Sequence, residues 1–205
     1  MQIDKSNKFL IGLTGNIASG KTLAMNMFDN NLFYKIDSDR IADTQLMQNR
    51  EVYEFLTETF GGDILDNDHR IDRKRLSQLA FSDRNLMKRL EGIIHPLVFK
   101  EVEEGLRRTD KKYAIIESAI LFESGLEQVF DRIITVFAPE EIRVRRLMKR
   151  AKIDYDEAMK KVRFQMSEFI KISRSDYAID NSKGIAWLKR QVKNVEEDIK
   201  TLING

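Results

Sequence analysis

Residues 15–22 read Gly-Asn-Ile-Ala-Ser-Gly-Lys-Thr, which completes the pattern G-x-x-x-x-G-K-[ST] of a phosphate-binding loop. The apolar run before it, Phe9 to Leu13, predicts a buried strand, and the run after it, Leu23 to Phe28, begins like a helix. A strand, this loop and a helix in that order surround phosphates with backbone N–H groups at a helix N-terminus, where the helix dipole favours negative charge. The stretch therefore predicts a binding site for a nucleoside triphosphate.

Several positions of the loop have a predicted role. Lys21 would reach the β- and γ-phosphates, and the hydroxyl of Thr22 would hold Mg²⁺. Gly15 and Gly20 stand where a side chain would block the turn or the phosphate. The predicted nucleotide-binding residues are Gly15, Asn16, Ile17, Ala18, Ser19, Gly20, Lys21, Thr22 and Leu23.

Length and composition limit the class of protein. The chain has 205 residues, 42% apolar and 33% charged, which suits one soluble domain, with or without insertions. The net charge of +2 gives no strong case for a nucleic-acid or membrane partner, and the lack of cysteine excludes disulfides and thiolate metal sites. The N-terminus lacks the apolar core of a signal peptide, and no stretch approaches the length of a membrane span. A cytoplasmic enzyme fits these observations, and so do many binding proteins; we expect the first.

Apolar runs that alternate with helical patterns predict an α/β fold, a parallel sheet flanked by helices. The region 40–108 contains no convincing strand, has apolar residues at helical spacing and predicts a helical insertion. A last helix carries an apolar stripe that we expect to pack against the sheet. The predicted strands are Phe9–Leu13, Leu32–Ile36, Tyr113–Ile116, Arg132–Phe137 and Tyr177–Ile179, and the stripe is Ile185, Leu188, Val192, Val195, Ile199 and Leu202.

An aspartate pair, Asp37-Ser38-Asp39, directly follows the second predicted strand. Ligands bind at the carboxyl ends of strands in open α/β sheets, so these carboxylates are expected close to the phosphate loop. Asp37 could take the proton of an acceptor hydroxyl or orient that hydroxyl, and one of the pair could hold Mg²⁺ through water. The alternative is an N-cap for a helix that begins near Arg40, which suits Asp39 better than Asp37.

Two later segments carry further candidates. Pro139 stands at a plausible first helical position, and Arg143, Arg146 and Arg150 then share one helix face. Such a face is often plain solvated surface, but in a nucleotide-binding protein we expect at least one of these arginines to contact phosphate or adenine. Glu117, at the end of the third strand, can join the Mg²⁺ shell or cap a following helix. The dipeptide at residues 95–96, His-Pro, is a candidate turn.

Taken in order, the motifs resemble those of the dephospho-coenzyme A kinase family over nearly the whole chain. The phosphate loop is shared by many families, whereas the aspartate pair, the His-Pro-Leu and the late Asp-Tyr-x-Ile-x-Asn are more specific. The matching pieces are Leu13 to Thr22, Ile36 to Asp39, Phe60-Gly61, Ile71-Asp72-Arg73 with Leu76, Ile94 to Leu97, Leu121 to Leu126, Arg146 to Arg150, Gln165, and Asp176 to Asn181.

The resemblance implies that ATP, with Mg²⁺, phosphorylates the ribose 3′-hydroxyl of dephospho-CoA in the last step of coenzyme A synthesis. It implies one kinase domain over residues 1–205, with the insertion at 40–108 gripping the acceptor and residues 139–168 forming a lid. Asp37 matches the proposed catalytic base of the family. The predicted catalytic set is Asp37, Lys21, Arg146 and Arg150; the acceptor set is Asp37, Asp39, Arg73 and His95; and Thr22 would bind Mg²⁺ with Asp37 or Glu117 through water.

The chain also departs from the family pattern. A second glycine usually follows Gly15, and a glycine often stands at position 18, where this chain has Asn16 and Ala18. Other departures are Glu117-Ser118-Ala119 for Asp-x-Pro, His69 for a turn glycine, and Asp43 for a basic residue. We therefore expect altered loop geometry at Asn16 and Ala18.

Other classes of function stay open at this point. One is another small-molecule, nucleoside or nucleoside-monophosphate kinase with this loop. A non-catalytic nucleotide switch is disfavoured because the chain lacks the guanine motif Asn-Lys-x-Asp and a switch Asp-x-x-Gly. A nucleic-acid-associated ATPase is disfavoured by the nearly neutral charge.

Overall fold

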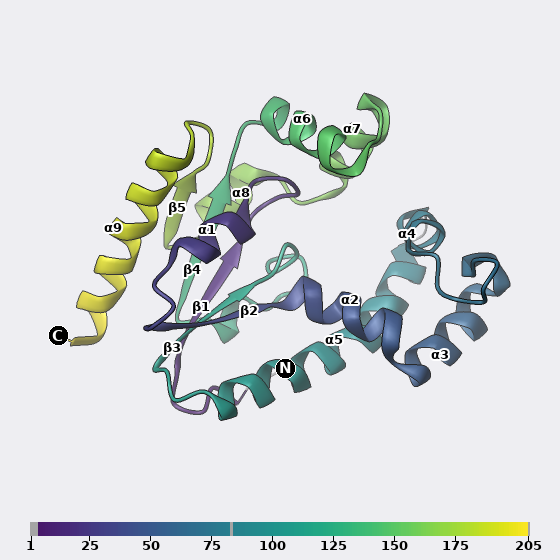
Figure 1. Cartoon of the computed structure of the whole chain (residues 1–205), viewed down its shortest axis with the longest axis horizontal. Helices are drawn as coiled ribbons and strands as arrows, with labels where there is room; N and C mark the ends of the chain where they lie inside the picture. Colours follow the sequence, from purple (N-terminus) through teal and green to yellow (C-terminus); the bar gives the residue numbers. More distant parts are fainter. Residues whose placement is uncertain (1–3, 83, 205) are drawn as a thin grey trace. The chain divides into compact units, whose positions relative to one another are not determined.

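The computed structural model describes residues 4–82 and 84–204, which form two compact units (Figure 1). The first unit joins Met1–Asp37 to Leu106–Gly205, and the second is Ser38–Gly105. In the part of the chain so described, no helix has the length and apolar character needed to cross a membrane.

The first unit is built on a parallel sheet of five strands in the order β2-β3-β1-β4-β5. Every predicted strand is present, with ends that differ from prediction by one residue at most. The predicted α/β fold class is confirmed. The strands are β1 (Phe9–Thr14), β2 (Phe33–Asp37), β3 (Tyr113–Glu117), β4 (Arg132–Phe137) and β5 (Tyr177–Asp180).

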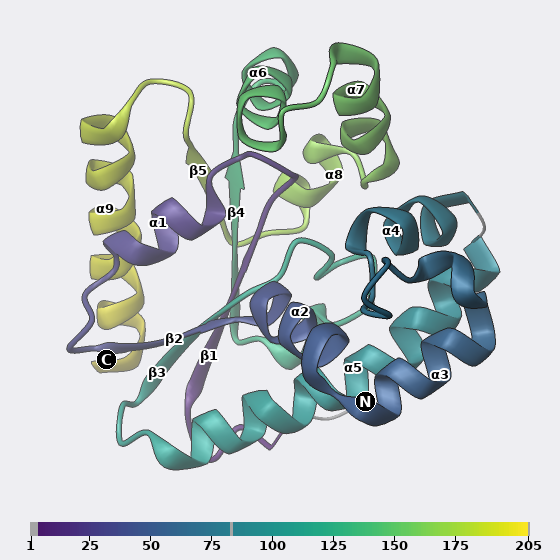
Figure 2. The same cartoon turned by 45° about the vertical axis from the view of Figure 1, so that its right-hand side comes forward.

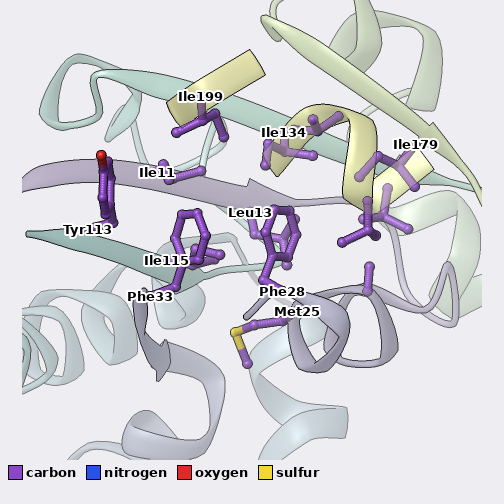
Figure 3. Close-up of a cluster of buried hydrophobic side chains, with 14 of the residues drawn as sticks. Ile11, Leu13, Met25, Phe28, Phe33, Tyr113, Ile115, Ile134, Ile179 and Ile199 are labelled. Carbon is purple, nitrogen blue, oxygen red and sulfur yellow. The ribbon is translucent and has the colours of Figure 1, made fainter. Parts of the chain in front are cut away.

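Helices cover both faces of this sheet, as a buried parallel sheet requires. On one face lie α1 (Lys21–Met27) and α9 (Ile185–Asn204), whose apolar side chains pack on Ile11, Leu13 and Ile134 (Figure 3). Figures 1 and 2 show these two helices next to each other. Four residues of the predicted α9 stripe are buried, whereas its ends are exposed: Leu188, Val192, Val195 and Ile199 against Ile185 and Leu202.

The opposite face carries Ile133 and Thr135 of β4, because side chains alternate along a strand. The hydroxyl of Thr135 donates to the carbonyl oxygen of Lys171 in α8 (Glu168–Ser173), so α8 lies on this face. On the same face a Cβ at Gly12 would lie 2.6 Å from Cδ1 of Leu121, so this strand position has no room for a side chain.

Two further helices of the first unit, α6 (Glu140–Ala151) and α7 (Tyr155–Phe164), lie side by side (Figures 1 and 2). Their contact buries an apolar cluster: Val144, Leu147, Ala158, Met159 and Val162. Pro139, the predicted first helical residue, is instead the N-cap of α6, so the helix begins one residue later than predicted, at Glu140. The short 3-10 helix η2 (Glu127–Val129) precedes β4.

The second unit is helical, and its elements are α2 (Ser38–Gln48), α3 (Arg50–Phe60), the 3-10 turn η1 (Gly62–Ile64), α4 (Arg73–Ser82) and the first part of α5 (Arg84–Arg108). Asn49 caps α3, accepting hydrogen bonds from the N–H groups of Glu51 and Val52. In the loop after η1, His69 has a φ of 58°, a conformation that favours glycine, the residue expected at this turn from the family pattern.

The predicted turn at His95-Pro96 is wrong, because both residues lie inside α5. Proline removes one hydrogen bond from a helix, and its preceding residue disfavours helical backbone. Buried apolar residues nevertheless recur every four positions on both sides of it: Ile94, Val98, Val102 and Leu106. This packed stripe outweighs the local preference of the proline.

Candidate active site

The phosphate loop connects β1 to α1. As predicted, its two glycines, Gly15 and Gly20, stand where a side chain does not fit. Gly15 has a φ of 146° and Gly20 a φ of 97°. A Cβ at Gly15 would lie 2.1 Å from the carbonyl oxygen of Val136, and a Cβ at Gly20 would lie 2.1 Å from Nδ2 of Asn181. Neither position can hold a side chain without displacing its surroundings.

The middle of the loop makes a tight turn. The N–H of Ser19 donates to the carbonyl oxygen of Asn16 at 3.0 Å, and Ala18, the third residue of the turn, has a φ of 61°. Positive φ at this place is typical of type II turns, which prefer glycine. For a residue with a Cβ the left-handed backbone costs about 1–2 kcal/mol. The departure at Ala18 therefore leaves a strained loop that other contacts must hold.

Lys21 and Thr22 open α1 next to a carboxylate of β3. Lys21 is only 8% exposed, and Leu23, two residues on, is 43% exposed. The hydroxyl of Thr22 donates to Oε1 of Glu117 at 2.8 Å. The residues after β3 form turns and no α-helix follows directly, so the helix-cap alternative for Glu117 is wrong.

Asp37 belongs to the same row of the sheet. It is the last residue of β2 and stands opposite Glu117 in the register, as does Leu13 of β1. Two carboxylates and the start of the phosphate loop thus lie at the carboxyl ends of three neighbouring strands, the usual ligand position in such sheets.

The helix after this strand begins earlier than predicted. α2 starts at Ser38, so Asp39 lies in its first turn, and the interpretation of Asp39 as the N-cap is wrong. A carboxylate in the first turn is favoured by the helix dipole. Asp37 is the residue directly before the helix.

The three arginines of α6 have different surroundings. Arg143 is buried, donates from Nε to the carbonyl oxygen of Ala138 at 3.0 Å and pairs with Glu168 at 3.3 Å. Burial raises the pKa of the Glu168 carboxyl, and the guanidinium of Arg143 opposes that shift. Arg143 therefore links α6 to α8.

Arg146 contacts the phosphate loop itself. Its guanidinium donates to the carbonyl oxygens of Ala18 and Ser19 at 3.4 and 3.3 Å and to that of Asn181 at 2.9 Å. Arg150, one turn further along α6, is exposed. The structure thus brings Arg146 to the loop and leaves Arg150 on the surface of the same helix.

The remaining acceptor candidates lie in the second unit. Arg73 donates to Oδ2 of Asp43 at 3.1 Å, with both side chains about half exposed. The acidic residue that departs from the family pattern thus partly neutralises Arg73. The ring of His95 is half-buried and meets that of Phe99 edge to face, with centroids 6.3 Å apart.

Burial lowers the pKa of His95 below its ordinary value of 6.5, and the nearby carboxylate of Glu91 opposes that shift. The unfolded chain therefore binds this proton more readily than the folded protein does. We expect the free energy of unfolding to fall as the pH drops below about 6.5, and to stop responding to this group below its folded-state pKa.

Urea unfolding at pH values on both sides of that window measures the effect. The substitution His95→Gln removes the titrating group. The variant should therefore lose less stability on acidification than the wild-type protein does. Equal losses in the two proteins would contradict the prediction.

Comparison with known proteins decides the family. The family model described as dephospho-CoA kinase matches residues 9–186. The chain belongs to the dephospho-CoA kinase family. A dephospho-CoA kinase of Aquifex aeolicus is 36% identical over 92% of this chain and 96% of its own length, and one of Bacillus licheniformis is 36% identical over 89% and 92%. The predicted family, and with it the predicted class of enzyme, a kinase, are confirmed.

The fold is similar to that of solved structures, one of which is named a dephospho-CoA kinase. The protein TT1252 from Thermus thermophilus superposes with a TM-score of 0.81 at 32% identity, covering 94% of this chain and 98% of its own. A dephospho-CoA kinase from Campylobacter jejuni gives a TM-score of 0.64 at 25% identity, over 97% and 98% of the two chains.

Two residues of the dephospho-CoA kinase motifs contact the loop although the sequence assigned them no role. Gln165 accepts the N–H of Ile17 at 2.6 Å, and Asn181 donates from Nδ2 to the carbonyl oxygen of Ser19 at 2.7 Å. The signal that points to them is their presence among the family motifs. Nothing in their local sequence indicates a partner about 150 residues away.

Proposed function

We propose that this member of the dephospho-CoA kinase family transfers the γ-phosphoryl group of ATP to the ribose 3′-hydroxyl of dephospho-CoA, giving coenzyme A and ADP. The observation that carries the proposal is the position of Asp37. Its carboxylate stands in one row with Glu117, whose Oε1 accepts the hydroxyl of Thr22 beside the phosphate loop. A proton acceptor and a phosphate site thus lie at the same edge of one sheet.

The donor half of the site is the loop and the start of α1. Backbone N–H groups at a helix N-terminus bind phosphate, and Lys21 supplies the positive charge for the β- and γ-phosphates. Phosphoryl transfer leaves little covalent chemistry to the protein, so positioning and charge stabilisation carry most of the catalysis. In this proposal Arg150 approaches the transferring group and Arg146 acts at the loop.

The residues present suit a magnesium ion. Thr22 and Glu117 offer a hydroxyl and a carboxylate 2.8 Å apart, and Mg²⁺ prefers such oxygen ligands while keeping several waters and the substrate phosphates. Asp37 is a further candidate, through water. When bound, the ion neutralises charge that develops on the phosphate oxygens.

Asp37 is proposed as the general base. The acceptor oxygen attacks the γ-phosphorus and forms the new O–P bond as the bond from the γ-phosphorus to the bridging oxygen breaks. The proton of the hydroxyl goes to the Asp37 carboxylate, and ADP leaves with the electron pair of the broken bond. This step needs the hydroxyl within hydrogen-bond reach of the carboxylate in the substrate complex.

The helical region 40–108 is proposed to bind dephospho-CoA, and residues 139–168, with α6 and α7, to act as the lid. Asp39, Arg73 and His95 are the acceptor candidates. The family's small-molecule substrates and the net charge of +2 support a cytoplasmic enzyme without a nucleic-acid partner.

A coupled assay for ADP tests the reaction. We expect ADP formation to require both dephospho-CoA and Mg²⁺, and the product to carry a 3′-phosphate. Turnover of ATP that is equal with and without dephospho-CoA would overturn the proposal. A panel of nucleosides and nucleoside monophosphates as acceptors separates it from the other kinase reading.

The substitution Glu117→Gln tests the metal ligand. Glutamine keeps the size of the side chain and can still accept the hydroxyl of Thr22, but it lacks the charge that attracts Mg²⁺. We expect the Mg²⁺ concentration for half-maximal activity to rise by about 10-fold or more, as is typical when the surroundings of a metal are changed. A titration of activity with Mg²⁺ at saturating ATP measures this, and an unchanged midpoint would remove Glu117 from the metal site.

A further inference from the structure

Two consecutive loop residues are fastened to two consecutive residues that directly follow α7. Nδ2 of Asn16 donates to the carbonyl oxygen of Met166 at 3.1 Å, and the N–H of Ile17 donates to Oε1 of Gln165 at 2.6 Å. Since a backbone carbonyl can only accept, the contact with Met166 fixes the orientation of the Asn16 amide. Asn16 is 3% exposed, so its side chain is committed to this place.

The segment Gln165–Met166 is itself anchored from the other side. The N–H of Met166 donates to Oε1 of Glu123 at 3.2 Å, and the same oxygen pairs with Nζ of Lys171 at 2.8 Å. Lys171 is fully buried and also donates to the carbonyl oxygen of Ala119 at 2.6 Å. A buried lysine held by a carboxylate and a carbonyl has little freedom, so this end of the proposed lid, to which the loop is bonded, is itself anchored.

We propose that Asn16 and Gln165 are positioning residues for the phosphates of ATP. They hold the outer turn of the phosphate loop in the shape in which its N–H groups converge. The inference rests on the proposed function only in that ATP is the nucleotide bound. Neither residue needs to touch the phosphates, because each acts through the backbone of the loop.

The strain at Ala18 is the reason that the loop needs the hydrogen bonds of Asn16 and Gln165, which we call its ties. Ala18 has a φ of 61° between Ile17, which Gln165 holds, and Ser19, whose carbonyl oxygen accepts from Asn181 and Arg146. A disfavoured backbone conformation persists only where its surroundings over-determine it. In this chain, Asn16 takes the place of the usual second glycine and adds one tie that a glycine cannot make.

The consequence is that loss of either tie weakens ATP binding and leaves chemistry largely intact. A loop that must be ordered when the nucleotide arrives binds less tightly than one already in shape. The acceptor and the general base are not part of these contacts. The expected signature is therefore a change in the KM for ATP without an equal change in kcat.

The substitutions Asn16→Gly and Gln165→Met test this from the two sides of the contact. The first restores the usual family residue, and the second keeps the length of the side chain but removes the acceptor for Ile17. We expect each to raise the KM for ATP about 3- to 10-fold, the range for one hydrogen bond, with kcat changed less than twofold. The KM for dephospho-CoA should not change.

Nucleotide binding without acceptor separates this proposal from the proposed reaction. Calorimetric titration of each variant with ATP and Mg²⁺ should show the same 3- to 10-fold loss of affinity, about what one hydrogen bond contributes. If the wild-type protein binds ATP but does not phosphorylate dephospho-CoA, the titration still decides the role of Asn16 and Gln165. An unchanged dissociation constant in both variants would overturn the positioning role.

A control variant removes the effect of lower stability alone. Asn49→Ala deletes the N-cap of α3 in the second unit, where its side chain accepts from Glu51 and Val52. It should lower the melting temperature without changing the affinity for ATP. If Asn49→Ala weakened ATP binding as much as Asn16→Gly, the effect would be one of general stability and the proposal would fail.

Discussion

Replacing Asp37 by asparagine is expected to lower kcat about 10²- to 10⁴-fold, the range for loss of a general base, while ATP still binds. Asparagine has nearly the same shape as aspartate but cannot accept a proton from the ribose hydroxyl. The ATP affinity should persist because the phosphate loop and Lys21 are untouched. Steady-state kinetics with a titration of ATP measures both parts of the prediction.

Asparagine is the informative replacement because Asp37 also directly precedes α2. Asparagine and aspartate are about equally good N-caps, so the substitution keeps any capping role and removes only the base. The melting temperature should therefore stay close to that of the wild-type protein. Near-full kcat in Asp37→Asn would show that the residue only caps the helix or places the substrate weakly.

Asp39→Asn is the matched control. Asp39 lies in the first turn of α2 and is proposed to bind the acceptor, so its loss should act mainly on the KM for dephospho-CoA. A large fall in kcat for Asp39→Asn, with little for Asp37→Asn, would exchange the roles of the two carboxylates.

The sheet could be predicted from the sequence because its physics is local. Strands of a parallel sheet are buried on both faces and so appear as short continuous apolar runs, of which Phe9–Thr14 is an example. The loop at residues 15–22 then fixes the carboxyl end of β1 as the ligand side. The place of Asp37 follows directly, since it ends the next strand along the chain.

Contacts between distant segments could not be predicted in this way. Arg143, Arg146 and Arg150 share one helix face, and only the neighbouring elements decide that the first is buried and the second reaches the loop. Two of the three acceptors of Arg146 are backbone carbonyls about 130 residues away, and every residue carries such a group. The predicted turn at Pro96 was wrong for the opposite reason. The local preference of proline against helix is outweighed by the buried apolar stripe of α5.

The role of Asn16 could be found only by combining the sequence with the structure. The sequence marks Asn16 only as a departure from a glycine. The structure supplies the reason for keeping a side chain there, a hydrogen bond to Met166, and it also shows the strain at Ala18 that this bond helps to hold. The two departures in the loop are therefore parts of one structural arrangement.

Replacing Lys21 by methionine is expected to lower kcat/KM for ATP about 10²- to 10³-fold, the size of effect seen when one preorganised donor to a developing charge is removed. Lys21 is the first residue of α1 and is only 8% exposed, so its charge acts in a poorly solvated place. Methionine keeps the length and apolar stem of the side chain. Both the affinity for ATP and kcat should fall, because the negative charge on the phosphates must be balanced before and during transfer.

Lys8→Met controls for the loss of one positive charge. Lys8 precedes β1, so it lies at the opposite end of that strand from the phosphate loop, where it donates to the carbonyl oxygen of Thr109 at 2.8 Å. The variant has the same net charge as Lys21→Met, and its kcat should equal that of the wild-type protein. An unchanged kcat at saturating ATP in Lys21→Met would limit Lys21 to binding, whereas a fall in kcat confined to Lys21→Met places its charge in the transition state.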